Sequence, residues 1–118
     1  MNTDAVPQTL GALVASTLWL CSQAQDAQDP GSRIAQMVCS ACHLVANGQP
    51  PPILNPPAPS FCEISNRASA SAGSMKRFVM HPHGTGAENT KMPDPMLMND
   101  QAVEVTRYVL GLKGHCHF

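Results

Sequence analysis

The sequence has little charge, few aromatic side chains and no long apolar segment. Charged residues make up 13% of its 118 residues, and seven Lys and Arg stand against eight Asp and Glu. The basic excess typical of nucleic-acid-binding proteins is therefore missing, and we expect no nucleic-acid partner. Aromatic residues make up only 4%. A single domain with so few large apolar side chains needs a metal, disulfides or a large cofactor to complete its core.

The longest apolar run covers residues 10–20, which is too short for the roughly 20 residues of a membrane-spanning helix. It is typical of a secretory signal, and the small residues after it predict cleavage behind Ala24. We therefore expect a signal peptide over residues 1–24 and one domain over residues 25–118. The alternatives are a buried N-terminal helix or a misassigned start codon, while lipidation of Cys21 is disfavoured because a bulky residue precedes it.

Cleavage would leave 94 residues with seven acidic and seven basic side chains. Export would place this domain in the periplasm of a bacterium, which is an oxidising compartment. We expect a monomer there, without a stable membrane span.

Apolar periodicity predicts an all-α fold of three to five short helices with long loops, and no segment carries a convincing strand pattern. Six prolines between Pro50 and Pro59 exclude a helix or an interior strand there. The clearest helix begins at an Asn99 cap and ends before Gly114. The other expected helices cover residues 31–38, 60–67 and 74–80, the last with Ser74 as its cap.

Residues 39–43 read Cys-Ser-Ala-Cys-His, the C-x-x-C-H attachment motif of c-type haem. Cys39 and Cys42, two residues apart on a helical turn, can each form a thioether with a haem vinyl group. His43 would then supply the proximal nitrogen to the iron. A zinc site would need a second pair of ligands, and a thioredoxin-like redox pair would need alternating strands and helices. Because both are missing, we predict one covalently bound haem c with its iron.

With this motif, the chain resembles the small monohaem class I cytochromes c of bacteria over most of residues 31–113. Gly31 stands where that family keeps a small residue so that the first helix can cross the last one closely. Pro52-Ile53-Leu54 resembles the family's Pro-x-Leu. This implies that the Pro52 carbonyl accepts a hydrogen bond from the proximal imidazole and that Leu54 packs on the haem. The chain departs from the family at Ala35, where an aromatic residue is usual.

The Met92-Pro93 pair before a helix containing Tyr108 resembles the loop that supplies the family's second axial ligand. The resemblance thus implies a cytochrome c-like fold with Met92 as distal ligand. A thioether is a soft, neutral ligand that raises the reduction potential. Met96 is an alternative ligand, and either His81 or His83 would give a bis-imidazole site of lower potential.

Axial positions filled by protein side chains favour a one-electron carrier, not an enzyme. Its expected partners are a periplasmic dehydrogenase, an oxidase or another cytochrome. The alternatives are a haem-based sensor of small ligands or a cytochrome subunit of a dehydrogenase complex. Cys62 and Cys116 could form a disulfide or remain thiols. The His-Cys-His tail at residues 115–117 is either a metal site or incidental.

Overall fold

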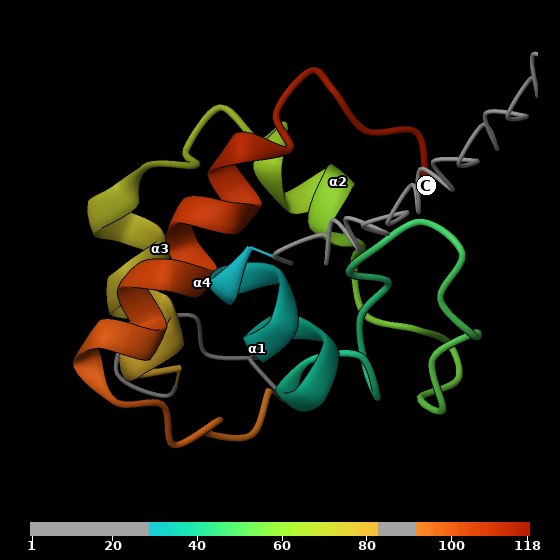
Figure 1. Cartoon of the computed structure of the whole chain (residues 1–118), viewed down its shortest axis with the longest axis horizontal. Helices are drawn as coiled ribbons and strands as arrows, with labels where there is room; N and C mark the ends of the chain where they lie inside the picture. The colour runs from blue at the N-terminus through green and yellow to red at the C-terminus, as the bar shows by residue number, and fades with distance from the viewer. Residues whose placement is uncertain (1–28, 83–91) are drawn as a thin grey trace, which may run out of the picture.

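The computed structural model describes residues 29–82 and 92–118, which form four helices and no strand. The predicted all-α fold class is therefore confirmed. The expected signal peptide and His83 lie outside the described residues. The helices, labelled in Figure 1, are α1 (Pro30–Val38), α2 (Phe61–Ser65), α3 (Ala72–Met80) and α4 (Asn99–Gly111).

Local capping explains where the first two helices begin. The Asp29 carboxylate accepts a hydrogen bond from the Ser32 N–H (3.0 Å), and Pro30 follows as the first helical residue, where its missing N–H costs nothing. At α2, the Ser60 hydroxyl accepts from the Glu63 N–H (3.1 Å) and the Glu63 carboxylate accepts from the Ser60 N–H (2.6 Å). This capping box starts the helix one residue later than the sequence predicted.

The starts of α3 and α4 differ from their predictions. Helix α3 begins two residues early because Ser71, not Ser74, is its cap, and each of these serines accepts a hydrogen bond from the other's N–H (3.2 and 3.1 Å). At α4 the cap position is Met98, whose N–H donates to the Gln101 side chain (2.9 Å). Asn99, predicted as the cap, is the first residue of the helix.

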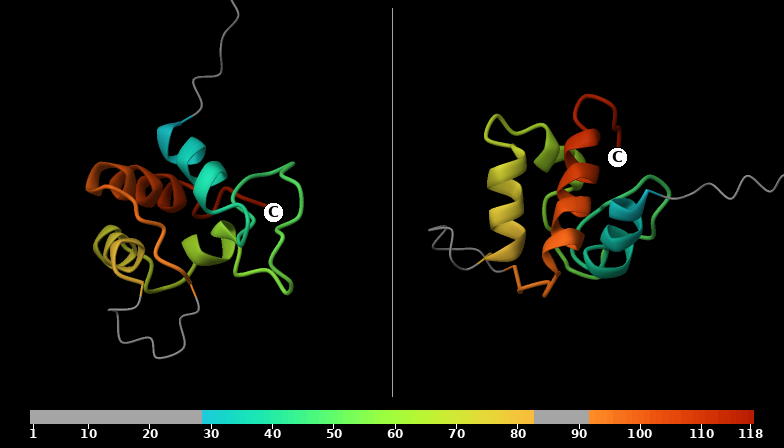
Figure 2. Two further views of the ribbon diagram at one scale, coloured as in Figure 1. Left: turned by 90° about the horizontal axis from the view of Figure 1, so that it is seen from below. Right: turned by 60° about the vertical axis from the view of Figure 1, so that its left-hand side comes forward.

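Helix α4 lies between α1 on one side and α3 on the other, as the views in Figures 1 and 2 show. Its crossing with α1 is close, because a Cβ on Gly31 would lie 2.1 Å from the Glu104 carbonyl oxygen. Next to it, Ala35 is completely buried in the core. A small side chain in place of the family's aromatic residue thus still packs without exposure. The buried core cluster consists of Ala35, Val45, Phe61, Val105 and Val109.

The proline-rich segment folds back on the residues that follow α1, on the opposite side of the fold from α3 (Figure 2). The Leu54 N–H donates to the Ala41 carbonyl (3.1 Å), and the Ala58 N–H donates to the Cys42 carbonyl (2.9 Å). These two bonds hold an ordered loop beside the C-x-x-C-H motif.

A disulfide joins Cys62 in α2 to Cys116 near the chain end, with a Cα–Cα distance of 5.8 Å. The pairing that the sequence left open is thus present in the structure. None of the described helices is long and apolar enough to cross a membrane.

Candidate haem-binding site

Two adjoining cavities, of about 240 and 280 Å³, open beside the end of α1. We call them together the cleft. The first is lined mainly by side chains of α2, α3 and α4. The second is lined by the end of α1 and the C-x-x-C-H motif, by the proline-rich segment (residues 50–59) and by the segment 92–95. The side chains that line both cavities are Cys39, His43, Met92 and Pro95. Three of these four carry the sulfur and nitrogen atoms that the sequence assigned to haem.

The His43 imidazole is held in one orientation by a hydrogen bond that defines the tautomer of its neutral form. Its Nδ1 lies 2.7 Å from the Pro59 carbonyl oxygen. Because a carbonyl can only accept, Nδ1 carries a proton, and a ring able to bind a metal then does so through Nε2. The Phe61 ring, 5.6 Å away between centroids and tilted by 52°, packs beside the imidazole. A hydrogen bond of this kind is the usual way to orient an imidazole that ligates a metal.

The carbonyl partner of His43 differs from the one expected, because the resemblance pointed to Pro52 and the structure has Pro59. The loop between these prolines turns back so that Pro59, just before the Ser60 cap, reaches the imidazole. Pro52 lines neither cavity, whereas Leu54 lines the second one. The structure thus brings Leu54 to the site and leaves Pro52 outside it.

Cys39 and Cys42 are free thiols at the end of α1, and both line the second cavity. Burial, with a smaller contribution from the neighbouring Cys42, raises the pKa of the Cys39 thiol to about 11. Thiols of disulfide-exchange enzymes have lowered pKa values instead, since the thiolate is the nucleophile. The environment of Cys39 therefore disfavours the thioredoxin-like alternative.

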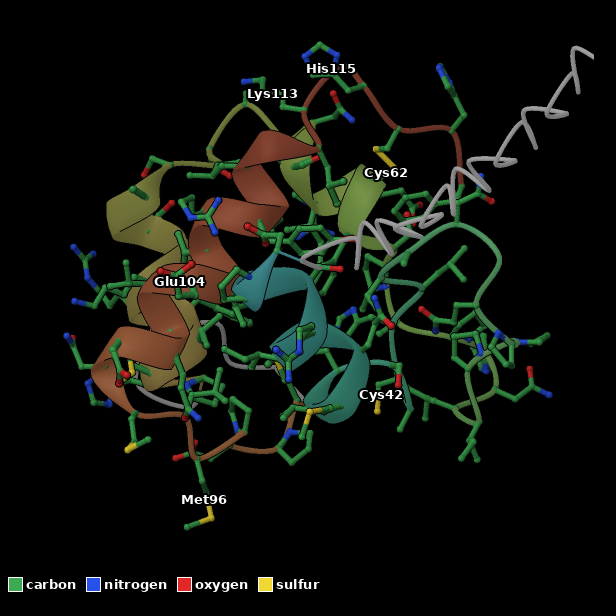
Figure 3. All side chains as sticks on the ribbon, in the orientation of Figure 1. Cys42, Cys62, Met96, Glu104, Lys113 and His115 are labelled. Carbon is green, nitrogen blue, oxygen red and sulfur yellow. A yellow bond between two sulfur atoms is a disulfide. The ribbon has the colours of Figure 1, made fainter. Side chains whose placement is uncertain are left out.

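Among the candidate distal ligands in the described residues, Met92 is the one that lines the cleft. Met96 is 87% exposed, and Figure 3 shows its side chain pointing away from the fold. His81 is exposed at the end of α3 and lines neither cavity. His83, the other histidine considered, lies outside the described residues.

The cleft contains a buried hydroxyl that needs a partner. Thr106 of α4 is 3% exposed and lines the first cavity, and its Oγ1 has no hydrogen-bond partner in the described part of the chain. An unpaired buried polar group costs about 1–3 kcal/mol. Together with the sulfur and imidazole donors, this orphaned hydroxyl fits a cleft that a bound group completes.

The C-terminal tail does not form a second metal centre within the described residues. Over residues 29–82 and 92–118, no group of three or more His, Cys, Asp or Glu side chains could hold a metal ion. Cys116 of the tail is in the disulfide with Cys62, and His115 and His117 are exposed.

Fold and site together define a small all-α protein with a haem-attachment motif facing an apolar cleft. A family model described as cytochrome c matches residues 28–113. The chain is also 30% identical over 83 residues to cytochrome c-552 of Bradyrhizobium diazoefficiens, covering 70% of this chain and 72% of that protein. No solved structure matches the chain. The chain belongs to the cytochrome c family.

Membership of this family makes the chain an electron-transfer haem protein that carries covalent haem c with its iron. The predicted family, fold and cofactor are thus confirmed. Sequence reasoning missed Pro59, Phe61 and Thr106. The proline immediately before the Ser60 capping box was a usable signal for Pro59, but five other prolines nearby obscured it.

Proposed function

We propose that the chain is a one-electron carrier of the bacterial periplasm, with haem attached through Cys39 and Cys42 and iron held by His43 and Met92. The observation that carries this proposal is that Cys39, His43 and Met92 line both cavities of the cleft. Bound haem supplies a one-electron couple there. The residues of this chain supply its attachment, its ligands and its exclusion from water.

His43 suits the proximal role because its ring is oriented before any ligand binds. The Pro59 carbonyl accepts a hydrogen bond from the Nδ1–H group, so Nε2 is the nitrogen available to bind a metal. A ring held in one orientation needs little rearrangement when the oxidation state of the iron changes, which favours fast electron transfer.

Met92 suits the distal role because its thioether is soft and uncharged, and such a ligand favours the reduced iron. Pro93 restricts the backbone just beyond it. If His43 and Met92 both hold the iron, no coordination position would stay open for a substrate. This supports a carrier over an enzyme.

The surface around the second cavity supports docking through apolar contacts. Val38 and Leu54 line that cavity and are 42% and 46% exposed, and Ile53 beside them is 88% exposed. With the signal of residues 1–24 removed, acidic and basic side chains balance. Docking with a periplasmic dehydrogenase, an oxidase or another cytochrome should therefore depend little on salt.

An absorption spectrum of protein exported together with haem-maturation machinery tests the proposal. We expect low-spin c-type bands in both oxidation states and, in the oxidised protein, the weak near-infrared band of a sulfur-to-iron bond. Low-spin bands without the sulfur band would assign the distal position to a histidine. A high-spin spectrum would favour the sensor of small ligands, and a colourless product would refute the proposal.

A further inference from the structure

The haem-attachment residues lie on a turn of residues 39–45, which we call the attachment turn. It lies beyond the regular part of α1, which ends at Val38. Its backbone groups therefore need partners from outside the helix. The N–H groups of Cys42 and His43 donate to the Cys39 carbonyl (3.1 and 2.9 Å). The carbonyls of Ser40 and His43 and the N–H of Val45 are met by one side chain, that of Gln49.

Gln49 uses both N–H donors and the oxygen acceptor of its amide on this turn. Its Nε2 donates to the His43 carbonyl (2.9 Å) and to the Ser40 carbonyl (3.3 Å), and its Oε1 accepts from the Val45 N–H (2.9 Å). Two acceptors and one donor on the backbone require two donors and one acceptor on the side chain. A primary amide offers this set, whereas the carboxylate of glutamate has no donor.

The turn is connected to the core through the same contacts. Val45 is completely buried, and its carbonyl accepts a hydrogen bond from the Tyr108 hydroxyl of α4 (2.7 Å). Gln49 thus links the backbone of His43 to a residue anchored on α4. The chain reverses at Gly48, whose φ of +74° glycine adopts without strain, and this reversal brings Gln49 back under the turn.

His43 is consequently held at two independent points. Its ring is held by Pro59 and packs beside Phe61, while its backbone carbonyl is held by Gln49. An imidazole has only two side-chain torsions, so a shift of the His43 backbone must move the ring or break its bond to Pro59.

We propose that Gln49 is a positioning residue that orients the His43 imidazole toward the iron by holding the backbone of the attachment turn. The inference rests on the proposed function, in which His43 is the proximal ligand. Gln49 does not line the cleft, and it acts on the axial bond through His43 alone.

The decisive comparison is between Gln49→Glu and Ser71→Ala in the full chain with haem attached. Gln49→Glu keeps the shape of the side chain and an acceptor for Val45, but faces two carbonyls with an oxygen in place of the NH₂ group. Ser71→Ala removes the cap of α3, a helix that does not carry the attachment turn. Both variants should lower Tm, which makes Ser71→Ala the control for simple loss of stability.

The readouts are the g-values of the low-spin ferric iron, which depend on the orientation of the axial imidazole, and the reduction potential. We expect shifted or broadened g-values and a changed potential in Gln49→Glu. Ser71→Ala should keep both at the native values. Native readouts in Gln49→Glu together with a lowered Tm would overturn the inference, because Gln49 would then have only a structural role.

A second variant covers poor folding of the first. Gln49→Met keeps the length of the side chain and adds no charge, and it should show the same spectral changes. If neither variant accumulates as a haem protein while Ser71→Ala does, Gln49 serves folding in general and the positioning role is wrong. If the native chain itself lacks covalent haem, the proposed function is wrong. If the native chain carries haem but the Gln49 variants keep its spectrum and potential, only the inference is wrong.

Discussion

The two walls of the cleft are built differently. The proximal wall, residues 39–45 with Pro59 and Phe61, contains the proposed ligand His43, whose ring and backbone are both hydrogen-bonded. The distal wall, residues 92–98, is largely exposed, and its described hydrogen bonds are local. The Met96 N–H donates to the Asp94 carboxylate (2.8 Å), and Met98 is bonded only to the first turn of α4. Met96 also has a φ of +53°, which is unusual for a residue with a side chain.

This difference indicates which of the two proposed iron ligands is oriented by contacts within the protein. The His43 imidazole is oriented by contacts within the protein. Met92, the proposed distal ligand, belongs to a segment with fewer such contacts among the described residues, so a bond to iron should itself help to order it. Substitutions in the proximal wall should therefore affect folding and attachment, whereas substitutions in the distal wall should affect ligation.

The largest effect is expected from removing the attachment thiols. In Cys39→Ser with Cys42→Ser, we expect complete loss of covalent haem, because no thioether can form. Haem that stays with the chain in a denaturing gel is the measurement. The matched control is Cys62→Ser with Cys116→Ser, which should keep covalent haem but lose up to about 4 kcal/mol of stability for a loop with a sequence separation of 54. Haem retained by the first double variant would contradict the assignment.

The close crossing of α1 and α4, which supports the proximal wall, is tested by a Gly→Ala substitution at equivalent positions of two helices. Gly31 and Gly73 are each the second residue of their helix, but only the Gly31 Cβ would collide, at 2.1 Å from the Glu104 oxygen. Gly31→Ala should destabilise by about 1–3 kcal/mol because α1 and α4 must separate. Gly73→Ala should be neutral or stabilising by up to about 1 kcal/mol. Thermal unfolding of both variants is the measurement, and equal Tm values would refute a close helix crossing.

The distal wall is tested by Met92→Ala against Met96→Ala. Met92→Ala should leave the haem attached and the fold intact but abolish the sulfur-to-iron band and open the iron to carbon monoxide. Its reduction potential should fall by on the order of 0.1 V, within the range of about 0.8 V that axial ligands control. Met96→Ala should change none of these, since Met96 does not line the cleft. Carbon monoxide binding by the native protein at the rate of Met92→Ala would favour the sensor instead.

The smallest effect is expected where Asp29 at the start of α1 meets Arg107 of α4. Partial burial opposes ionisation, but hydrogen bonds from Arg107 and Ser32 outweigh it and lower the pKa of Asp29. The stabilisation is therefore present above the usual carboxyl pKa of about 4 and is lost as pH falls through the lower folded value.

Asp29→Asn keeps a good helix cap and removes the ion pair. The native chain should exceed this variant in Tm by no more than a few degrees at pH 7, and the difference should shrink with salt. It should also shrink as the pH is lowered through the folded pKa of Asp29. A Tm difference that does not fall with pH in acid would show that the charge of Asp29 is not its cause.

The sequence predicted those parts of the fold and site that depend on local patterns. Helical periodicity located the four helices, and the spacing of Cys39, Cys42 and His43 pointed to haem. Helix boundaries were less accurate because Ser71 and Ser74 are both good caps, and only their mutual hydrogen bonds show which one starts α3.

Long-range contacts set the features that the sequence did not reveal. Six prolines lie between residues 50 and 59, and which carbonyl meets His43 depends on how the loop folds back, not on any local property of Pro52 or Pro59. Gln49 and Thr106 carry no motif at all. The importance of Gln49 follows from backbone partners that only the folded chain brings to it. That of Thr106 follows from a buried hydroxyl without a hydrogen-bond partner in the described part of the chain.

The disulfide between Cys62 and Cys116 creates a sorting problem during maturation. The four cysteines of the described residues can pair in three ways, and a bond between Cys39 and Cys42 would consume the thiols that haem attachment needs. In the oxidising compartment that we propose for it, the chain must therefore oxidise one pair while keeping the other reduced. Cys42 and Cys62 lie apart in Figure 3, Cys62 in the upper and Cys42 in the lower part of the view. Early docking of the C-terminal segment on α2 would thus direct oxidation to the correct pair, and the order of these events becomes a determinant of yield.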